Sequence, residues 1–120
     1  MDEFDGYPVR RGFAGPGWHL EDCEAVAAQY PRTFKLPSKA ARAGAQVGSL
    51  MRLHFVITDP GITANPENPR AERMWVEVCE ASGDGAMLGH LTNQPMWIGS
   101  LEPGDVIEFQ WKHVAQVDGV

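Results

Sequence analysis

Leu50–Thr58, which reads LMRLHFVIT, is the stretch that decides the fold. Apolar and polar side chains alternate along it, so that one face carries Met51, Leu53, Phe55 and Ile57, and the other carries Arg52, His54 and Thr58. Side chains two residues apart lie on the same face of a strand. The stretch therefore predicts a β-strand with one face in the core and a polar face opposite it.

The same alternation recurs downstream of this strand. Arg73–Glu80 and Met87–Leu91 flank the turn sequence Ser82-Gly83-Asp84-Gly85, and together they predict a hairpin. Shorter strands are expected at Arg32–Leu36, at Met96–Ile98 and near the end of the chain, where Ile107, Phe109 and Trp111 share a face. Short turns between successive strands favour antiparallel pairing.

A helix and a loose arm precede the sheet. Apolar residues recur at helical spacing over residues 18–30, Pro31 ends the pattern, and Lys39–Ala45 predicts a brief helix or turn. Residues 1–17 are rich in Gly and Pro without a visible period, which predicts a loosely ordered N-terminal arm before a single domain over residues 18–117. The expected fold class is α+β, a strongly bent antiparallel sheet or small barrel of about five or six short strands with one N-terminal helix packed on it.

The charge is acidic overall and uneven along the chain. The net charge of −6 argues against nonspecific binding to nucleic acid or to an anionic membrane, because both need a basic surface. Residues 1–24, 25–58 and 59–120 carry net charges of −4, +5 and −7, and the middle segment contains no acid. Two interpretations stay open: the charges intermix on folding, or they form a polarised surface that steers a charged partner.

The sequence lacks metal-binding cysteine pairs, a signal peptide and a membrane span, and these absences guide our expectations about location and cofactors. Cys23 and Cys79 form no CxxC pair, so a zinc or redox motif is unsupported and both are expected to be buried structural thiols. The acidic, then Gly/Pro-rich start does not resemble a signal peptide, and no apolar run could span a bilayer. We expect a cytoplasmic protein without a cofactor.

Catalytic patterns are also missing. The sequence contains no GxSxG elbow, P-loop, GxGxxG fingerprint or HExxH helix. His19, His54, His90 and His113 form no HxH or HxxxH pair, so ordinary histidines are favoured over a metal held by His90, His113 and Asp105. Glu77 and Glu108 could form a carboxylate pair only if their strands were adjacent. No metal site is expected, and a non-catalytic protein is favoured while the question of an enzyme stays open.

Two features suggest binding. In the Leu91–Pro95 turn, Asn93 and Gln94 could either hold the register of the strands or contact a ligand. Trp75 and Trp97 could either join the core or form an aromatic surface. The candidate binding residues are therefore Trp75, Glu77, His90, Asn93, Gln94 and Trp97.

The long segment Asp59–Glu72 is a candidate partner loop. It contains three prolines and is longer than most loops inside compact domains. The residues expected to contact a partner are Asp59, Asn65, Glu67, Asn68 and Arg70.

Three stretches together carry a family resemblance. They are WHLEDCEAVAAQYPRTFKLPS from residue 18, RMWVEVCEASGDGAMLGHLTNQP from residue 73 and LEPGDVIEFQWKHV from residue 101. With their M-W-V-x-V, L-x-N-x-P and L-x-x-G-D-x-I-x-F patterns, they resemble uncharacterised bacterial domains related to the YegJ-like domain of unknown function. Some neighbouring families are grouped with immunity proteins of toxin systems, so the resemblance implies binding without catalysis, with a toxin or effector as the partner.

Three functions follow from the sequence. The leading hypothesis is a non-catalytic, immunity-like or regulatory domain that occludes a protein partner with its acidic C-terminal sheet and the Asp59–Glu72 loop. The second is a small-molecule binder or minor enzyme with a site near Trp75, His90, Asn93 and Trp97. The third is a structural module that forms homo-oligomers through an exposed strand edge.

Overall fold

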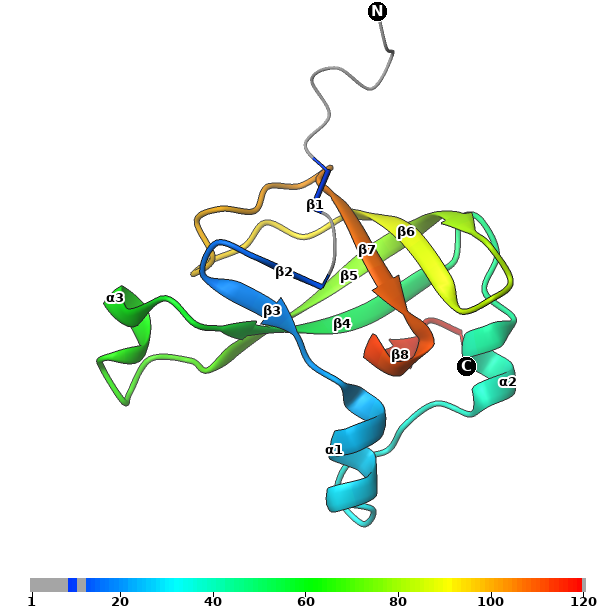
Figure 1. Ribbon diagram of the computed structural model, residues 1–120, viewed down its shortest axis with the longest axis horizontal. Coiled ribbons are helices and arrows are strands. Elements are labelled where there is room, and N and C mark those ends of the chain that lie inside the picture. The colour runs from blue at the N-terminus through cyan, green and yellow to red at the C-terminus, as the bar shows by residue number, and fades with distance from the viewer. Residues whose placement is uncertain (1–8, 11–12, 120) are drawn as a thin grey trace, which may run out of the picture.

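The computed structural model describes residues 9–10 and 13–119, and it confirms the α+β class: a curled, mainly antiparallel sheet with a few short helices (Figure 1). The strands are β1 (Val9–Arg10), β2 (Ala14–Gly15), β3 (Trp18–Leu20), β4 (Leu50–Ile57), β5 (Ala71–Ala81), β6 (Ala86–Leu91), β7 (Val106–Gln110) and β8 (Val114–Val117). The helices are α1 (Cys23–Gln29), α2 (Lys39–Ala43), α3 (Pro60–Thr63) and the 3-10 helix η1 (Trp111–His113). None of the described helices has both the length and the apolar character needed to cross a membrane.

Strand β4 organises the sheet. The strand order is β1-β7-β6-β5-β4-β3-β2, and among the described strands only the β1–β7 pairing is parallel. One edge of β4 is shared, because β3 pairs with Phe55–Ile57 while β8 pairs with Met51–Leu53. His54 lies between these two partners, and its carbonyl accepts the Glu21 N–H at 2.9 Å. The chain therefore leaves the sheet beside His54 as it passes from β3 to α1.

The core lies on the face of β4 that the alternation predicts. Met51, Leu53 and Phe55 are fully buried, and Ile57 is 4% exposed. The opposite face departs from the prediction, because His54 is only 7% exposed. Its ring is packed edge-on by Phe34, at 5.9 Å between centroids, so the segment after α1 covers part of the polar face.

Two predictions near the N-terminus of the chain are wrong. The helix expected over residues 18–30 begins only at Cys23, because Trp18–Leu20 pairs with β4 and the Asp22 side chain caps the helix by accepting the Ala25 N–H. The strand expected at Arg32–Leu36 does not form, since the Thr33 and Phe34 N–H groups both bond to the Tyr30 carbonyl in a turn. Of the expected arm, the described Ala14–Gly15 pairs with β3, and residues 1–8 and 11–12 lie outside the described residues.

The C-terminal half brings four further corrections. Met96–Ile98 is a loop and not a strand, because its N–H groups bond to a side chain. Trp111 begins η1 instead of continuing β7, and β8 was not foreseen. Cys79 is half-buried, whereas Cys23 is fully buried as expected.

Candidate functional site

The loop after β6 is fixed by one carboxylate. Glu72, near the start of β5, accepts the N–H groups of Met96, Trp97 and Ile98 at 2.8, 3.0 and 2.9 Å. Ile98 is buried at 4% exposure, whereas Met96 is 86% and Trp97 38% exposed. The loop backbone is therefore held in place while two large apolar side chains remain in contact with water.

A groove of about 570 Å³ lies beside Trp97. It is formed by three chain segments, whose lining residues are Pro16, Gly17, Thr58, Asp59, Pro60, Ile62, Trp97, Ile98, Gly99 and Ser100. In Figure 1 the yellow-to-orange loop runs beside the turn between β2 and β3. Hydrogen bonds join these walls, from the Ser100 hydroxyl to the Pro16 carbonyl at 2.7 Å and from the Thr58 N–H to the Gly17 carbonyl at 2.9 Å.

Two residues that the sequence analysis assigned to different candidate sites line this one groove. Trp97 comes from the candidate binding set and Asp59 from the candidate partner loop. Asp59 is the N-cap of α3, where its carboxylate accepts the Gly61 N–H at 2.9 Å. Among the described lining residues it is the one charged side chain, so the groove is weakly acidic, with polar and apolar surface in about equal parts.

The other candidate binding residues lie elsewhere. Glu77 pairs with His90 across β5 and β6, and Trp75 pairs with Arg52 across β5 and β4. The Asn93 side-chain oxygen accepts the Trp75 N–H at 2.6 Å, which is the register-holding role. Gln94 is exposed, and its amide approaches only the carbonyl of the neighbouring Pro95.

The candidate partner loop is folded onto itself. The Asn65 side chain accepts the Glu67 N–H at 3.0 Å, and the Asn68 amide donates to the Ile62 carbonyl at 2.9 Å. The Arg70 carbonyl accepts the Ile57 N–H at 2.9 Å, and the side chains of Glu67 and Arg70 lie in an exposed stretch. These bonds explain how a long, proline-rich segment stays ordered beside the groove.

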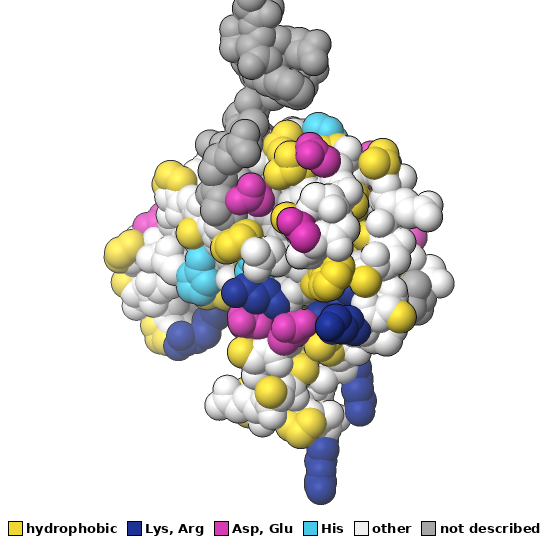
Figure 2. Space-filling model, turned by 45° about the vertical axis from the view of Figure 1, so that its right-hand side comes forward, with side chains coloured by type: hydrophobic (Ala, Val, Ile, Leu, Met, Phe, Trp, Pro, Cys, Tyr) yellow, Lys and Arg dark blue, Asp and Glu magenta, His cyan; other side chains and the backbone are white. Residues whose placement is uncertain are grey.

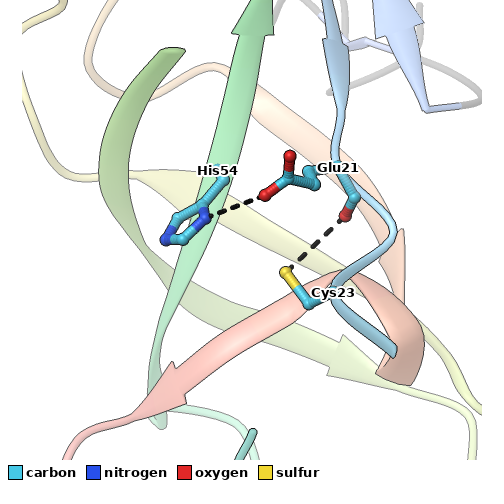
Figure 3. Close-up of side chains that lie close together, drawn as sticks. All are labelled: Glu21, Cys23 and His54. Carbon is cyan, nitrogen blue, oxygen red and sulfur yellow. Dashed lines mark hydrogen bonds and ion pairs between the residues drawn. The ribbon is translucent and has the colours of Figure 1, made fainter. Parts of the chain in front are cut away.

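The metal and carboxylate alternatives from the sequence do not assemble. His90 Nδ1 lies 3.3 Å from the Gly104 carbonyl, while His113 Nδ1 accepts the Gln110 N–H at 3.0 Å. Strand β6 separates β5 from β7, so Glu77 and Glu108 are not on adjacent strands. In the part of the chain that the structure describes, possible metal-ligand atoms of three such residues converge at Glu21, Cys23 and His54, within 4.8 Å of one another (Figure 3).

Two polar groups of that cluster, His54 Nδ1 and the Cys23 thiol, have partners within the fold. His54 Nδ1 lies 3.3 Å from a Glu21 carboxylate oxygen, and the Cys23 thiol lies 3.7 Å from the Glu21 carbonyl and 3.5 Å from the His113 carbonyl. Burial, with the nearby charges of Glu21 and Asp22, raises the pKa of Cys23 to about 12. A neutral thiol is a weak nucleophile and a weak metal ligand. We interpret Cys23 as structural and assign no metal to the cluster.

A second cleft, of about 490 Å³, has a basic lining that the candidate residue sets missed. It lies between the segment 33–37, the polar face of β4, β5 and β8. Lys35, Arg52, His54 and Arg73 line it, and no described Asp or Glu does. The signal in the sequence was the acid-free, basic segment 25–58, which supplies three of these four residues.

We expect Glu72→Ala to release the Met96–Ile98 loop and to lower the free energy of unfolding by about 1–2 kcal/mol, because three N–H groups lose a charged acceptor and water replaces it at the exposed ones. Hydrogen exchange should show faster exchange of the Met96, Trp97 and Ile98 amides. Glu80→Ala, on an exposed position of the same strand, is the matched control. Unchanged exchange in Glu72→Ala would contradict the anchoring role.

Comparison with protein-family models, curated proteins and solved structures finds no match.

Proposed function

We propose that this protein is a non-catalytic binding domain that docks a partner protein on the surface formed by Met96, Trp97 and the adjacent groove. The observation that carries the proposal is that the two exposed apolar side chains sit on a backbone held by three hydrogen bonds to Glu72. A fixed loop loses little conformational entropy on binding. Exposed tryptophans on such a loop are typical anchors of protein interfaces.

The chemistry of the groove indicates what the partner presents. Its lining combines apolar side chains such as Ile62 and Trp97 with the charged Asp59, and residues 59–120 carry a net charge of −7. A partner segment with an apolar side chain to pack on Trp97 and a basic side chain to face Asp59 fits this surface. The resemblance to YegJ-related domains suggests a toxin or effector as the partner, and we propose that the domain acts by occluding it.

The test compares two pairs of exposed apolar residues. Met96→Ala/Trp97→Ala should weaken binding of the partner by about tenfold or more, because truncation removes the central apolar anchor. Tyr30→Ala/Val47→Ala is the matched control, since Tyr30 and Val47 are 54% and 72% exposed and lie outside the groove lining. Stoichiometric capture from the source cell should be kept by the wild type and the control, and lost by the Met96/Trp97 variant.

Two results would overturn this proposal. One is capture of the same protein by all three forms, which would place the interface elsewhere. The other is a homo-oligomer in light scattering that the Met96/Trp97 variant converts to a monomer, since the surface would then serve self-association.

A further inference from the structure

The basic cleft combines three cations that have no ionic partner in the described part of the chain. Lys35, Arg52 and Arg73 line one cleft, and none of their side chains makes a hydrogen bond or ion pair to another described residue. The Arg52 guanidinium lies over the Trp75 ring at 5.9 Å, which fixes its position. The cluster is basic although the chain as a whole has a net charge of −6.

Two buried nitrogens beneath this cleft also lack partners. Arg52 Nε and His54 Nε2 are both inaccessible to water and have no hydrogen-bond partner among the described residues. Figure 3 shows the two ring nitrogens of His54 on opposite sides, with Nδ1 toward Glu21 and Nε2 directed away from both Glu21 and Cys23. Unpaired buried polar atoms are costly to the folded state, so they commonly mark a functional site.

One face of the molecule shows how charged side chains are distributed. The face in Figure 2 carries acidic and basic side chains side by side near its middle, whereas Lys and Arg side chains project from its lower end. Helix α1 and the chain that follows it occupy that end of the molecule (Figure 1). The face shown is therefore mixed in charge, and three cationic side chains, Lys35, Arg52 and Arg73, line the cleft between the segment 33–37, β4 and β5.

We propose that this cleft binds a doubly charged oxyanion group, phosphate-like or dicarboxylate, carried by a small molecule. Arginine pairs with both groups through two parallel hydrogen bonds, and Lys35 adds a third positive charge at the rim. The cleft is large enough for a small molecule, at about 490 Å³. This site is independent of the Met96–Trp97 surface and does not need a protein partner.

His54 links this binding to proton uptake. Burial lowers the pKa of His54, the Glu21 carboxylate on the β3–α1 connection raises it, and Arg73 on β5 and Arg52 on β4 lower it. The remaining groups around it are Lys35 on the covering segment, the neutral Cys23 thiol at α1 and the uncharged Gln116 on β8. A bound dianion offsets the two arginines, so protonated His54 becomes more favourable and binding tightens as the pH falls through the pKa of His54.

Sulfate is the best probe, because it stays doubly charged across the neutral and mildly acidic range. In two-dimensional NMR titrations at constant ionic strength, sulfate should shift the Phe34, Arg52 and Arg73 amides and bind more tightly at lower pH.

Arg73 is exposed, so the Arg73→Gln substitution should not affect folding, and it should weaken sulfate binding about tenfold. His54→Gln should remove the pH dependence. Malonate is titrated in parallel to separate a dicarboxylate from a phosphate-like group, and binding of either probe at the cleft supports the proposal.

Lys112→Gln is the matched control, since it removes the same charge from a different cleft that Glu24 and Asp84 also line. The proposal fails if neither sulfate nor malonate shifts the cleft amides. It also fails if Arg73→Gln and Lys112→Gln reduce the affinity equally, because that would be a response to net charge alone.

Discussion

Lowering the pH from 7 to about 4 should remove about 3 kcal/mol of the free energy of unfolding through His113 alone. His113 is 3% exposed, its Nδ1 accepts the Gln110 N–H at 3.0 Å, and the Phe13 ring lies 4.5 Å away between centroids. Burial and the neighbouring Lys112 lower its pKa from 6.5 to about 4, while Asp22 and Glu24 oppose the change. The folded protein therefore keeps this ring neutral in a range where the unfolded chain protonates it.

The sign of the change in unfolding free energy with pH follows from the number of protons bound in each state. Between pH 6.5 and about 4 the unfolded chain binds a proton at His113 that the folded protein does not, so acid favours unfolding. The stabilisation is complete above pH 6.5 and falls steadily as the pH drops to about 4. Urea unfolding followed by circular dichroism at several pH values across this range measures the loss.

His113→Asn separates this effect from the titration of other groups. The asparagine oxygen can accept the Gln110 N–H as Nδ1 does, but it cannot take up a proton. The variant should be less stable at neutral pH because it leaves a small cavity, yet its stability should fall less steeply toward pH 4 than that of the wild type. Parallel curves for the two proteins would show that His113 is not the titrating group.

The parts of the fold that the sequence predicted depend on local patterns. The alternation of Leu50–Ile57 and the Ser82–Gly85 turn between β5 and β6 both lie within one element or one hairpin. The three residues Trp18–Leu20 could not be recognised as a strand, because their partners lie on β4, more than thirty residues away in the sequence. Tertiary pairing of this kind overrides helical spacing.

The candidate site was predictable only in pieces. Trp97 and Asp59 were identified separately, but nothing local indicates that Glu72 holds the loop that brings them to one groove. The basic segment 25–58 was visible in the sequence. Arg73 lies outside that segment and reaches the same cleft because β5 pairs with β4, where Arg73 is opposite His54. Burial of His54 was hidden because the covering segment was predicted to be a strand.

Arg42→Ala should lower the free energy of unfolding by about 3 kcal/mol, because this one side chain joins four parts of the structure. It extends from α2, and its Nε donates to the Pro37 carbonyl at 3.1 Å. Its Nη1 donates to the Glu24 carboxylate of α1 at 2.6 Å and to the Trp111 carbonyl of η1 at 3.1 Å. The Arg42 side chain is only 5% exposed, so water cannot easily replace these bonds after truncation.

The exposure of the Arg42 partners determines how much unfolding free energy the Arg42→Ala variant should lose. Glu24 is 49% exposed and stays hydrated when the arginine is removed, so the loss should be smaller than for a fully buried pair, and the larger share comes from the two carbonyl groups. Arg42→Lys keeps the charge but cannot span the carbonyl groups and the carboxylate together, so it should recover only part of the stability. Lys39→Ala removes the same charge from an exposed position of α2 and should change the stability by less than about 0.5 kcal/mol. Urea unfolding at constant pH compares the three variants, and equal losses for Arg42→Ala and Lys39→Ala would mean that α1, α2 and η1 are held together without this arginine.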